Sequence, residues 1–307
     1  MKILLTGSTG MVGRNIVDNN NSNKYELLCP TSSELNLLDN KAVHDYITCH
    51  SPDLIIHAAG LVGGIQANIK RPVDFLVSNL KMGVNIVNEA KNCGVKNFIN
   101  LGSSCMYPKG IDTAISEDAL LTGKLEHTNE GYALAKITVA KLCEYITRES
   151  EGYHYKTIIP CNLYGKYDKF DEHSSHMIPA VINRIHNAKV NNIKLIEIWG
   201  DGESRREFMY AEDFANFIYQ AIPNVQRLPC MLNVGLGHDF SINDYYKVIA
   251  EEIGYKGSFT HDLTKPVGMR RKLVDITLLS EFGWKYQFEL RDGIKETYKY
   301  YLENVYK

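Results

Sequence analysis

The fold is decided near the N-terminus by the stretch Ile3-Leu4-Leu5-Thr6-Gly7-Ser8-Thr9-Gly10-Met11-Val12-Gly13. Its apolar start predicts a buried strand, and the residues after Gly10 have the apolar spacing of a helix. Gly7 permits a tight turn, Gly10 lets the backbone approach a pyrophosphate, and Gly13 lets the helix pack closely on the strand. Free N–H groups at the helix start hold the phosphates. The stretch therefore predicts a dinucleotide-binding turn formed by Gly7, Ser8, Thr9, Gly10, Met11, Val12 and Gly13.

Short apolar segments alternate with helical patterns through the first half of the chain. Strands are predicted at 3–5, 25–29, 53–57, 97–101 and 156–160, and helices at 73–93 and 132–149. This alternation predicts an α/β fold with a Rossmann-like doubly wound parallel sheet. After Pro160 the pattern loosens, which predicts a second, smaller mixed α/β substrate lobe. Its predicted elements are a strand at 196–199 and helices near 177–188, 243–253 and 291–303.

The domain boundary is expected to be discontinuous, because the helix predicted after Tyr210 has the pattern of one that returns to the large lobe. We therefore expect a dinucleotide-binding domain at 1–165, with a returning segment at about 208–235. The substrate lobe is expected at 166–207 and 236–307.

Composition narrows the class of protein. Of 307 residues, 44% are hydrophobic and 23% charged, which is ordinary for a globular chain. With 34 basic and 36 acidic residues the net charge is −2, so no broad basic field suggests a nucleic-acid partner. Seven cysteines without a C-x-x-C pair argue against a disulfide framework or a cysteine-based zinc site and favour a reducing cytoplasm. No apolar run is long enough for a signal peptide or a membrane span, so no membrane association is expected.

A second group of residues has the chemistry of a ketone reductase. Tyr132 and Lys136 stand four positions apart and share one face of the predicted helix. Ser103 and Ser104 follow the strand predicted at 97–101, at the sheet edge where ligands bind. A free tyrosine has a pKa of about 10. An adjacent ammonium is expected to lower the pKa of Tyr132, which would then protonate the alkoxide formed by hydride transfer.

Longer strings extend the pattern: Glu34-Leu35-Asn36-Leu37-Leu38-Asp39, Val62-Gly63-Gly64-Ile65, Leu101-Gly102-Ser103-Ser104-Cys105-Met106-Tyr107-Pro108, Thr128-Asn129-Glu130-Gly131-Tyr132-Ala133-Leu134-Ala135-Lys136, Asn162-Leu163-Tyr164-Gly165, Ser175-His176-Met177-Ile178-Pro179-Ala180, Trp199-Gly200-Asp201-Gly202, Arg206-Glu207-Phe208 and Arg271-Lys272-Leu273-Val274-Asp275. Together they resemble the GDP-L-fucose synthase family of extended short-chain dehydrogenase/reductases, over essentially the whole chain. The resemblance implies NADPH-dependent reduction of the C4 ketone of a GDP-4-keto-6-deoxy sugar, coupled to epimerisation at C3 and C5.

The same resemblance implies roles for individual residues. Ser103, Tyr132 and Lys136 would form the reductase triad, with Cys105 and His176 as the base and acid of epimerisation. Besides the glycine turn, cofactor contacts would come from Asn36, Leu37, Leu101, Gly102, Ser103, Lys136, Pro160, Asn162, Leu163 and His176. Contacts to the GDP-sugar would come from Arg184, Trp199, Arg206 and Lys272. The helices at 73–93 and 132–149 would form a homodimer interface.

The sequence leaves the cofactor and the sugar open. The stretch 29–34 has neither an acidic residue for a ribose 2′-hydroxyl nor an arginine for a 2′-phosphate at the expected spacing. The hydroxyls of Thr31, Ser32 and Ser33 favour NADP, and NAD is not excluded. The loop 166–170, which the resemblance places next to the sugar, departs from the family pattern. A hexose and a heptose therefore both remain possible as the sugar of the substrate. An enzyme that only reduces an already epimerised GDP-4-keto-6-deoxy-heptose remains an alternative.

Other classes fit the residues less well. A 4,6-dehydratase needs an acidic acid–base pair where this chain has Ser104 and Cys105, and a nucleotide-sugar 4-epimerase has no use for Cys105 paired with His176. A non-catalytic NADP-sensing protein keeps the glycine turn but usually loses the tyrosine or the lysine. His173 and His176 could together bind a metal ion, but they lack a third ligand, so no metal is expected.

Overall fold

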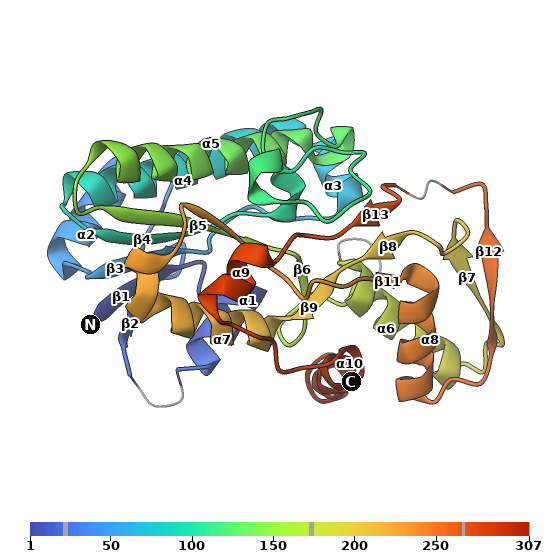
Figure 1. Ribbon diagram of the computed structural model, residues 1–307. Coiled ribbons are helices and arrows are strands. Elements are labelled where there is room, and N and C mark those ends of the chain that lie inside the picture. The colour runs from blue at the N-terminus through green and yellow to red at the C-terminus, as the bar shows by residue number, and fades with distance from the viewer. Residues whose placement is uncertain (21–23, 172–174, 266–267, 307) are drawn as a thin grey trace.

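A computed structural model describes residues 1–20, 24–171, 175–265 and 268–306. Its largest element is a six-stranded, fully parallel sheet in the order β10-β5-β4-β3-β1-β2 (Figure 1). The strands are β1 (Lys2–Thr6), β2 (Glu26–Leu28), β3 (Leu54–His57), β4 (Asn97–Leu101), β5 (His154–Pro160) and β10 (Met231–Val234). The predicted doubly wound parallel sheet is confirmed. The strand order reverses between β1 and β3, and in such sheets ligands bind beyond the carboxyl ends of the strands at that point.

Helices cover both faces of this sheet (Figure 1). One face carries α2 (Asn40–His50), α4 (Pro72–Asn92) and α5 (Glu130–Glu149), and the other carries α1 (Met11–Asp18) and α7 (Ala211–Ala221). Successive strand side chains point to opposite faces. Leu4, Ile55 and Phe98 therefore join the core beneath α2, α4 and α5, whereas their neighbours Ile3 and Ile56 join the core beneath α1 and α7. Both faces are buried, which explains why these strands are continuously apolar.

Helices α4 and α5 pack unusually closely. An added Cβ at Gly83 of α4 would lie only 2.3 Å from Val139 Cγ2 of α5. The missing side chain therefore sets the distance between the two helices.

Helix α2 begins after a capping residue. The Asp39 carboxylate accepts hydrogen bonds from the backbone N–H groups of Lys41 and Ala42.

The second half of the chain adds smaller sheets and more helices. Paired strands are β6 (Asn162–Tyr164) with β9 (Phe208–Tyr210), β7 (Leu195–Trp199) with β12 (Ser258–Asp262), and β8 (Arg205–Arg206) between β11 (Phe240–Ser241) and β13 (Arg271–Lys272). The helices are α6 (Met177–Val190), α8 (Ile242–Ile253) and α10 (Leu290–Asn304), with the shorter α3 (Ile65–Lys70) and α9 (Thr277–Phe282) elsewhere. A separate apolar core unites α6, α8 and α10 with β7.

The chain crosses between the two cores more than once. Helix α7 packs on α1, and β10 joins the edge of the large sheet, within the segment expected to return. Later residues, Val274, Leu279 and Trp284, also belong to the core of the large sheet. The lobe boundaries stay a prediction. The sequence analysis did not anticipate α2, α3, α9, β10 or the strands of the smaller sheets other than β7. His173 lies outside the described residues.

In the described part of the chain, no helix combines the length and the apolar character that crossing a membrane requires.

Candidate active site

Ser103, Cys105 and Tyr132 meet at the carboxyl end of β4. Ser103 follows this strand, and its Oγ accepts a hydrogen bond from the backbone N–H of Cys105 at 3.2 Å, which starts a 3-10 turn (Ser104–Met106). Tyr132 lies in the first turn of α5, and its hydroxyl is hydrogen-bonded to the Ser103 side chain. The structure therefore brings together three residues that the sequence analysis placed in the site.

The proton on Tyr132 is held firmly. Burial raises the pKa of its hydroxyl and the nearby Cys105 adds to the shift, while the hydrogen bond with Ser103 opposes it. The expectation that Lys136 lowers this pKa is wrong for the observed contacts. The Lys136 ammonium donates to the carbonyl of Leu101 at 2.8 Å and lies 5.9 Å from the centre of the Tyr132 ring. Burial lowers the pKa of Lys136 itself to about 8.

The sulfur of Cys105 is surrounded by hydrogen-bond donors. Lys272 Nζ lies 3.6 Å from Sγ, and the side-chain amide of Asn129 donates to Sγ at 3.1 Å. Burial alone raises the pKa of Cys105, but the charge of Lys272 and hydrogen bonds with Ser103, Lys272 and Asn129 outweigh it, so the pKa lies below its ordinary value. The sequence analysis gave Asn129 no role, although it stands in the string that ends at Lys136.

Four basic residues on β8 and β13 divide between two environments. Arg205 is in register with Arg271, and Arg206 with Lys272, so each pair shares one face of the small sheet. Arg205 and Arg271 both form ion pairs with the buried Asp239. In the described residues no carboxylate lies within ion-pair distance of Arg206 or Lys272. The second pair therefore places unneutralised positive charge beside Cys105.

The carboxylate next to Arg206 does not pair with it. Glu207 accepts hydrogen bonds from the backbone N–H groups of Leu236, Gly237 and Val274, at 2.5, 2.9 and 3.0 Å. Burial raises the pKa of Glu207 to about 7 in spite of these donors. Its role is to tie together backbone segments around the site, which leaves Arg206 available for an anion.

His176 lies apart from this group. It is the N-cap residue of α6 without a capping side-chain bond, and its Nδ1 lies 3.5 Å from the buried carboxylate of Asp168. The hydrogen bond with Asp168 raises the pKa of His176, so the imidazolium persists to higher pH. Among the described contacts none joins His176 directly to Cys105. Asp168 received no role in the sequence analysis, although it lies in the loop that departs from the family pattern.

Arg184 and Trp199 lie on α6 and β7, two elements of the second apolar core. Trp199, at the end of β7, is 55% exposed, and Lys265 Nζ lies 5.7 Å from the centre of its ring. Arg184 of α6 donates to the carbonyl of Glu197 at 3.2 Å and is hydrogen-bonded to Tyr246. The exposed Trp199 is thus not a core residue, whereas Arg184 is half-buried and held by these two contacts.

The glycine turn has the shape that a pyrophosphate needs. Gly7 adopts φ +75°, and an added Cβ there would lie 2.6 Å from the backbone nitrogen of Ala59. A Cβ on Gly13 would lie 2.2 Å from the carbonyl oxygen of Gly7, whereas a Cβ on Gly10 would meet nothing closer than that oxygen at 3.5 Å. Two glycines are therefore required by close packing, and the third keeps the backbone open to a phosphate.

The remaining cofactor candidates are mostly held by backbone contacts. Asn162 donates to the carbonyl of Glu207 at 2.9 Å, and Asn36 accepts from the N–H of Leu38 at 3.1 Å. Leu37 is buried, and its carbonyl accepts from Asn85. The other candidates beyond the glycine turn are Leu101, whose carbonyl accepts from Lys136, and Gly102, Pro160 and Leu163. These residues shape the edge of the sheet, and their contacts with a cofactor stay a prediction.

A parallel sheet with a glycine turn after its first strand, and a Ser–Tyr–Lys group after its fourth, defines an extended short-chain dehydrogenase/reductase. Residues 3–235 match the NAD dependent epimerase/dehydratase family. A GDP-L-colitose synthase from Yersinia pseudotuberculosis is 60% identical over 98% of this chain and 98% of its own length. A GDP-L-fucose synthase from Escherichia coli K12 is 39% identical over 99% and 97%. The chain therefore belongs to this family, and within it to the group of GDP-L-fucose and GDP-L-colitose synthases.

A solved structure shows the same fold. A GDP-D-glycero-L-gluco-heptose synthase from Campylobacter jejuni, determined in the presence of NADPH, superposes with a TM-score of 0.91 at 28% identity, over 98% of both chains. A GDP-mannoheptose C4 reductase from the same organism, with NADP bound, gives a TM-score of 0.88 at 29% identity, again over 98% of both chains. The predicted family and fold are confirmed.

Proposed function

We propose that the protein reduces the C4 ketone of a GDP-4-keto-6-deoxy sugar with NADPH and first epimerises that sugar at a carbon next to the ketone. The observation that supports this most directly is the convergence of Tyr132, Ser103 and Cys105 at one sheet edge, with Lys272 beside the sulfur. The predicted enzyme class, an NADP-dependent oxidoreductase acting in GDP-sugar synthesis, is confirmed by the relatives.

The chain's own residues fit a dinucleotide at the switch between β1 and β3. The glycine turn offers its backbone to the pyrophosphate, and NADPH, when bound, supplies the hydride. The loop after β2 presents the exposed hydroxyls of Thr31, Ser32 and Ser33. Glu34 accepts two hydrogen bonds from Thr31, both at 2.8 Å, so its carboxylate is directed to that residue.

In the reduction step Tyr132 serves as the acid. Because burial keeps its hydroxyl protonated, Tyr132 can donate a proton to the oxygen at C4 as that oxygen gains negative charge. Ser103, hydrogen-bonded to Tyr132, orients the carbonyl. Lys136 fixes the turn after β4 through the Leu101 carbonyl and keeps a positive charge near the phenol.

In the epimerisation step Cys105 serves as the base. The lowered pKa of Cys105 favours the thiolate, and a thiolate can remove a carbon-bound proton next to a ketone. His176, whose protonated form is favoured by Asp168, serves as the acid that returns a proton to the opposite face.

The GDP moiety is bound by positive charge from the small sheet and by the second lobe. Arg206 and Lys272 share a face without carboxylate partners in the described chain, which suits a diphosphate. Arg184 adds a further cation, and the exposed ring of Trp199 offers a surface for the base or the sugar.

The sugar itself is the open part of the proposal. The relative at 60% identity is a GDP-L-colitose synthase, and colitose is a 3,6-dideoxyhexose. A GDP-4-keto-3,6-dideoxy sugar is therefore the first substrate to test, ahead of the 3-hydroxy hexose and the heptose. On a 3-deoxy sugar only C5 is a stereocentre that epimerisation can invert. An enzyme that reduces without epimerising is the alternative.

The deciding experiment is incubation of the protein and NADPH with these three GDP-4-keto sugars in D₂O. Deuterium at C5 and a product inverted at C5 would support coupled epimerisation and reduction, whereas reduction without deuterium uptake would leave a reductase only. Cys105→Ser is expected to abolish deuterium uptake and to retain reduction of an already epimerised substrate. Loss of both activities together would mean that Cys105 shapes the site and does not act as the base.

We also propose that the chain forms a homodimer through α4 and α5. Both helices carry exposed apolar side chains, including Val73 and Val77 on α4 and Leu134 and Tyr145 on α5. Pairing α4 and α5 with the same helices of a second copy would cover these residues in a four-helix arrangement. Sedimentation at micromolar concentration tests this, and a monomeric mass would refute it.

A further inference from the structure

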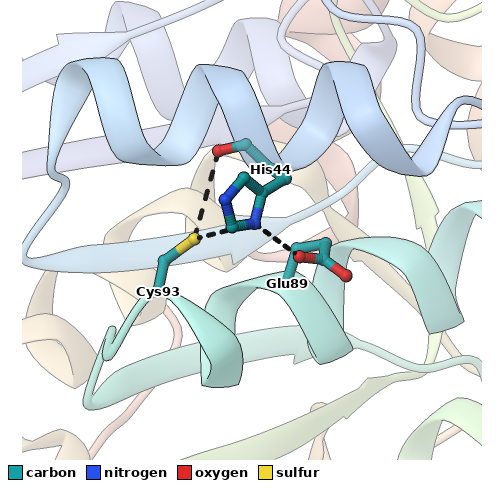
Figure 2. Close-up of side chains that lie close together, drawn as sticks. All are labelled: His44, Glu89 and Cys93. Atoms are coloured by element: carbon teal, nitrogen blue, oxygen red, sulfur yellow. Dashed lines mark hydrogen bonds and ion pairs between the residues drawn. The ribbon is translucent and has the colours of Figure 1, made fainter.

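His44, Glu89 and Cys93 form a cluster where α2 meets the end of α4 (Figure 2). His44 Nδ1 lies 2.8 Å from a Glu89 carboxylate oxygen and 3.6 Å from the Cys93 sulfur. One potential ligand atom from each residue lies within 4.8 Å of the other two. None of the three residues belongs to the active site described above, so the cluster needs its own explanation.

We propose that this cluster binds a Zn²⁺ ion, with one ligand atom from each residue and a water molecule in the fourth position. Imidazole nitrogen, thiolate sulfur and carboxylate oxygen are the donors that zinc takes in proteins, and sites with three protein ligands keep one open position. The thiolate of Cys93 and the carboxylate of Glu89 together balance the two charges of the ion. Binding releases the thiol proton of Cys93 to solvent.

The separations are close to those of a tetrahedral site. Zinc bond lengths place a coordinated nitrogen and sulfur about 3.5 Å apart, and a coordinated nitrogen and oxygen about 3.4 Å apart. The imidazole and the sulfur already stand at 3.6 Å. The carboxylate and the imidazole, at 2.8 Å, share a proton that the ion would replace, and they need to separate by roughly half an ångström.

The surroundings orient the ligands and leave an entry path. Asn40 and Asn92 both donate to the second carboxylate oxygen of Glu89, at 2.9 and 3.2 Å, so the first oxygen points to His44. Such outer contacts orient metal ligands. The Glu89 side chain is 8% exposed but that of His44 is 49% exposed. His44 and Cys93 both line an open groove of about 440 Å³, through which an ion could enter.

The geometry argues against a Cys–His–Glu nucleophile. In a catalytic triad the imidazole uses one nitrogen for the nucleophile and the other for the carboxylate. Here both Glu89 and Cys93 approach the same nitrogen, Nδ1, so no proton can be relayed through the ring. Three donors converging on one region suit an ion between them.

Cobalt provides the sharpest test, because a Co²⁺–thiolate bond gives a near-ultraviolet charge-transfer band. The full-length protein, stripped with a chelator, is titrated with CoCl₂ and then with ZnCl₂ as competitor. We expect one equivalent of Co²⁺ to produce the band and Zn²⁺ to remove it. Cys93→Ser and His44→Gln should lose the band, whereas Cys49→Ser, which changes an exposed cysteine on α2, should keep it.

Two further variants test whether the band comes from another thiol and whether the contacts of Glu89 support metal binding. Cys105→Ser should keep the band, and a band lost there but kept in Cys93→Ser would overturn the proposal. Asn40→Ala removes one donor to Glu89 and should weaken Zn²⁺ binding about 10–100-fold. Zn²⁺ should raise the unfolding temperature of the wild type but not of Cys93→Ser. Absence of the band in the wild type would show that the cluster is only an ion pair with a neighbouring thiol.

Discussion

Lys272 Nζ lies 3.6 Å from the sulfur of Cys105, although 167 positions separate the two residues along the chain. The contact exists because β13 pairs with β8 and carries Lys272 to the edge of the large sheet where Cys105 follows β4. A cation at this distance favours the thiolate over the thiol. Besides the contact with an anionic substrate proposed for it, the lysine therefore favours the thiolate of the residue proposed as the base.

Lys272→Met should raise the pKa of Cys105, because it removes the charge that stabilises the thiolate. The measurement is the rate of Cys105 alkylation by iodoacetamide as a function of pH, followed by mass spectrometry of the labelled peptide. Lys41→Met, which changes an exposed lysine paired with Asp45, is the control and should leave the profile unchanged. An unchanged profile in Lys272→Met would show that hydrogen bonds from Asn129 and Ser103 are enough to lower the pKa of Cys105.

Tyr132→Phe should slow ketone reduction by roughly 10²–10⁴-fold, because it removes the proton donor and keeps the ring. Single-turnover oxidation of NADPH measures the step directly, and NADPH fluorescence measures binding, which should be retained. Deuterium uptake through Cys105 should also persist in this variant. Near-normal reduction would remove Tyr132 from the acid role.

Asp168→Asn should lower the pKa of His176, since the carboxylate that favours the imidazolium is lost. The wild-type group stays protonated to higher pH than an ordinary histidine, so deuterium uptake should fall only as pH rises through that raised pKa. In the variant the same decline should begin at lower pH. NMR titration of the His176 imidazole checks the shift independently of turnover. If wild type and Asp168→Asn titrate at the same pH, Asp168 does not raise the pKa of His176.

Reduction should decline as pH rises through about 8, where Lys136 loses its proton. Below that pH the charged ammonium donates to the Leu101 carbonyl and holds the end of β4 that precedes Ser103, and loss of the charge weakens this hydrogen bond. The pH profile of single-turnover reduction, at saturating substrate, checks this. A rate that stays constant to pH 10 would show that the charge on Lys136 is not needed.

Gly83→Ala should destabilise the fold by about 1–3 kcal/mol, because its Cβ would overlap Val139 of α5. Urea unfolding measures the loss. The double variant Gly83→Ala, Val139→Ala should recover part of it, because the shortened side chain makes room for the methyl group. Additive losses in the double variant would mean that the close approach of α4 and α5 is not what Gly83 provides.

Much of the site followed from local sequence. The turn from Gly7 to Gly13 requires its glycines, and the structure shows two of them in contacts that no side chain could replace. Tyr132 and Lys136 lie on one helix face because four residues make about one turn. The direction of the pKa shift of Tyr132 did not follow, because it depends on burial and on where the Lys136 ammonium points.

The sequence by itself determined the parallel sheet, the dinucleotide turn and the Ser–Tyr–Lys group, because each depends on short-range periodicity and spacing. Only the tertiary structure decided which of the four basic residues on β8 and β13 are neutralised by Asp239, since strand register sets the face of each side chain. It also decided that His44 of α2 meets Glu89 of α4 and Cys93, the residue that follows this helix. These contacts join segments far apart in sequence, and no local pattern carries information about them.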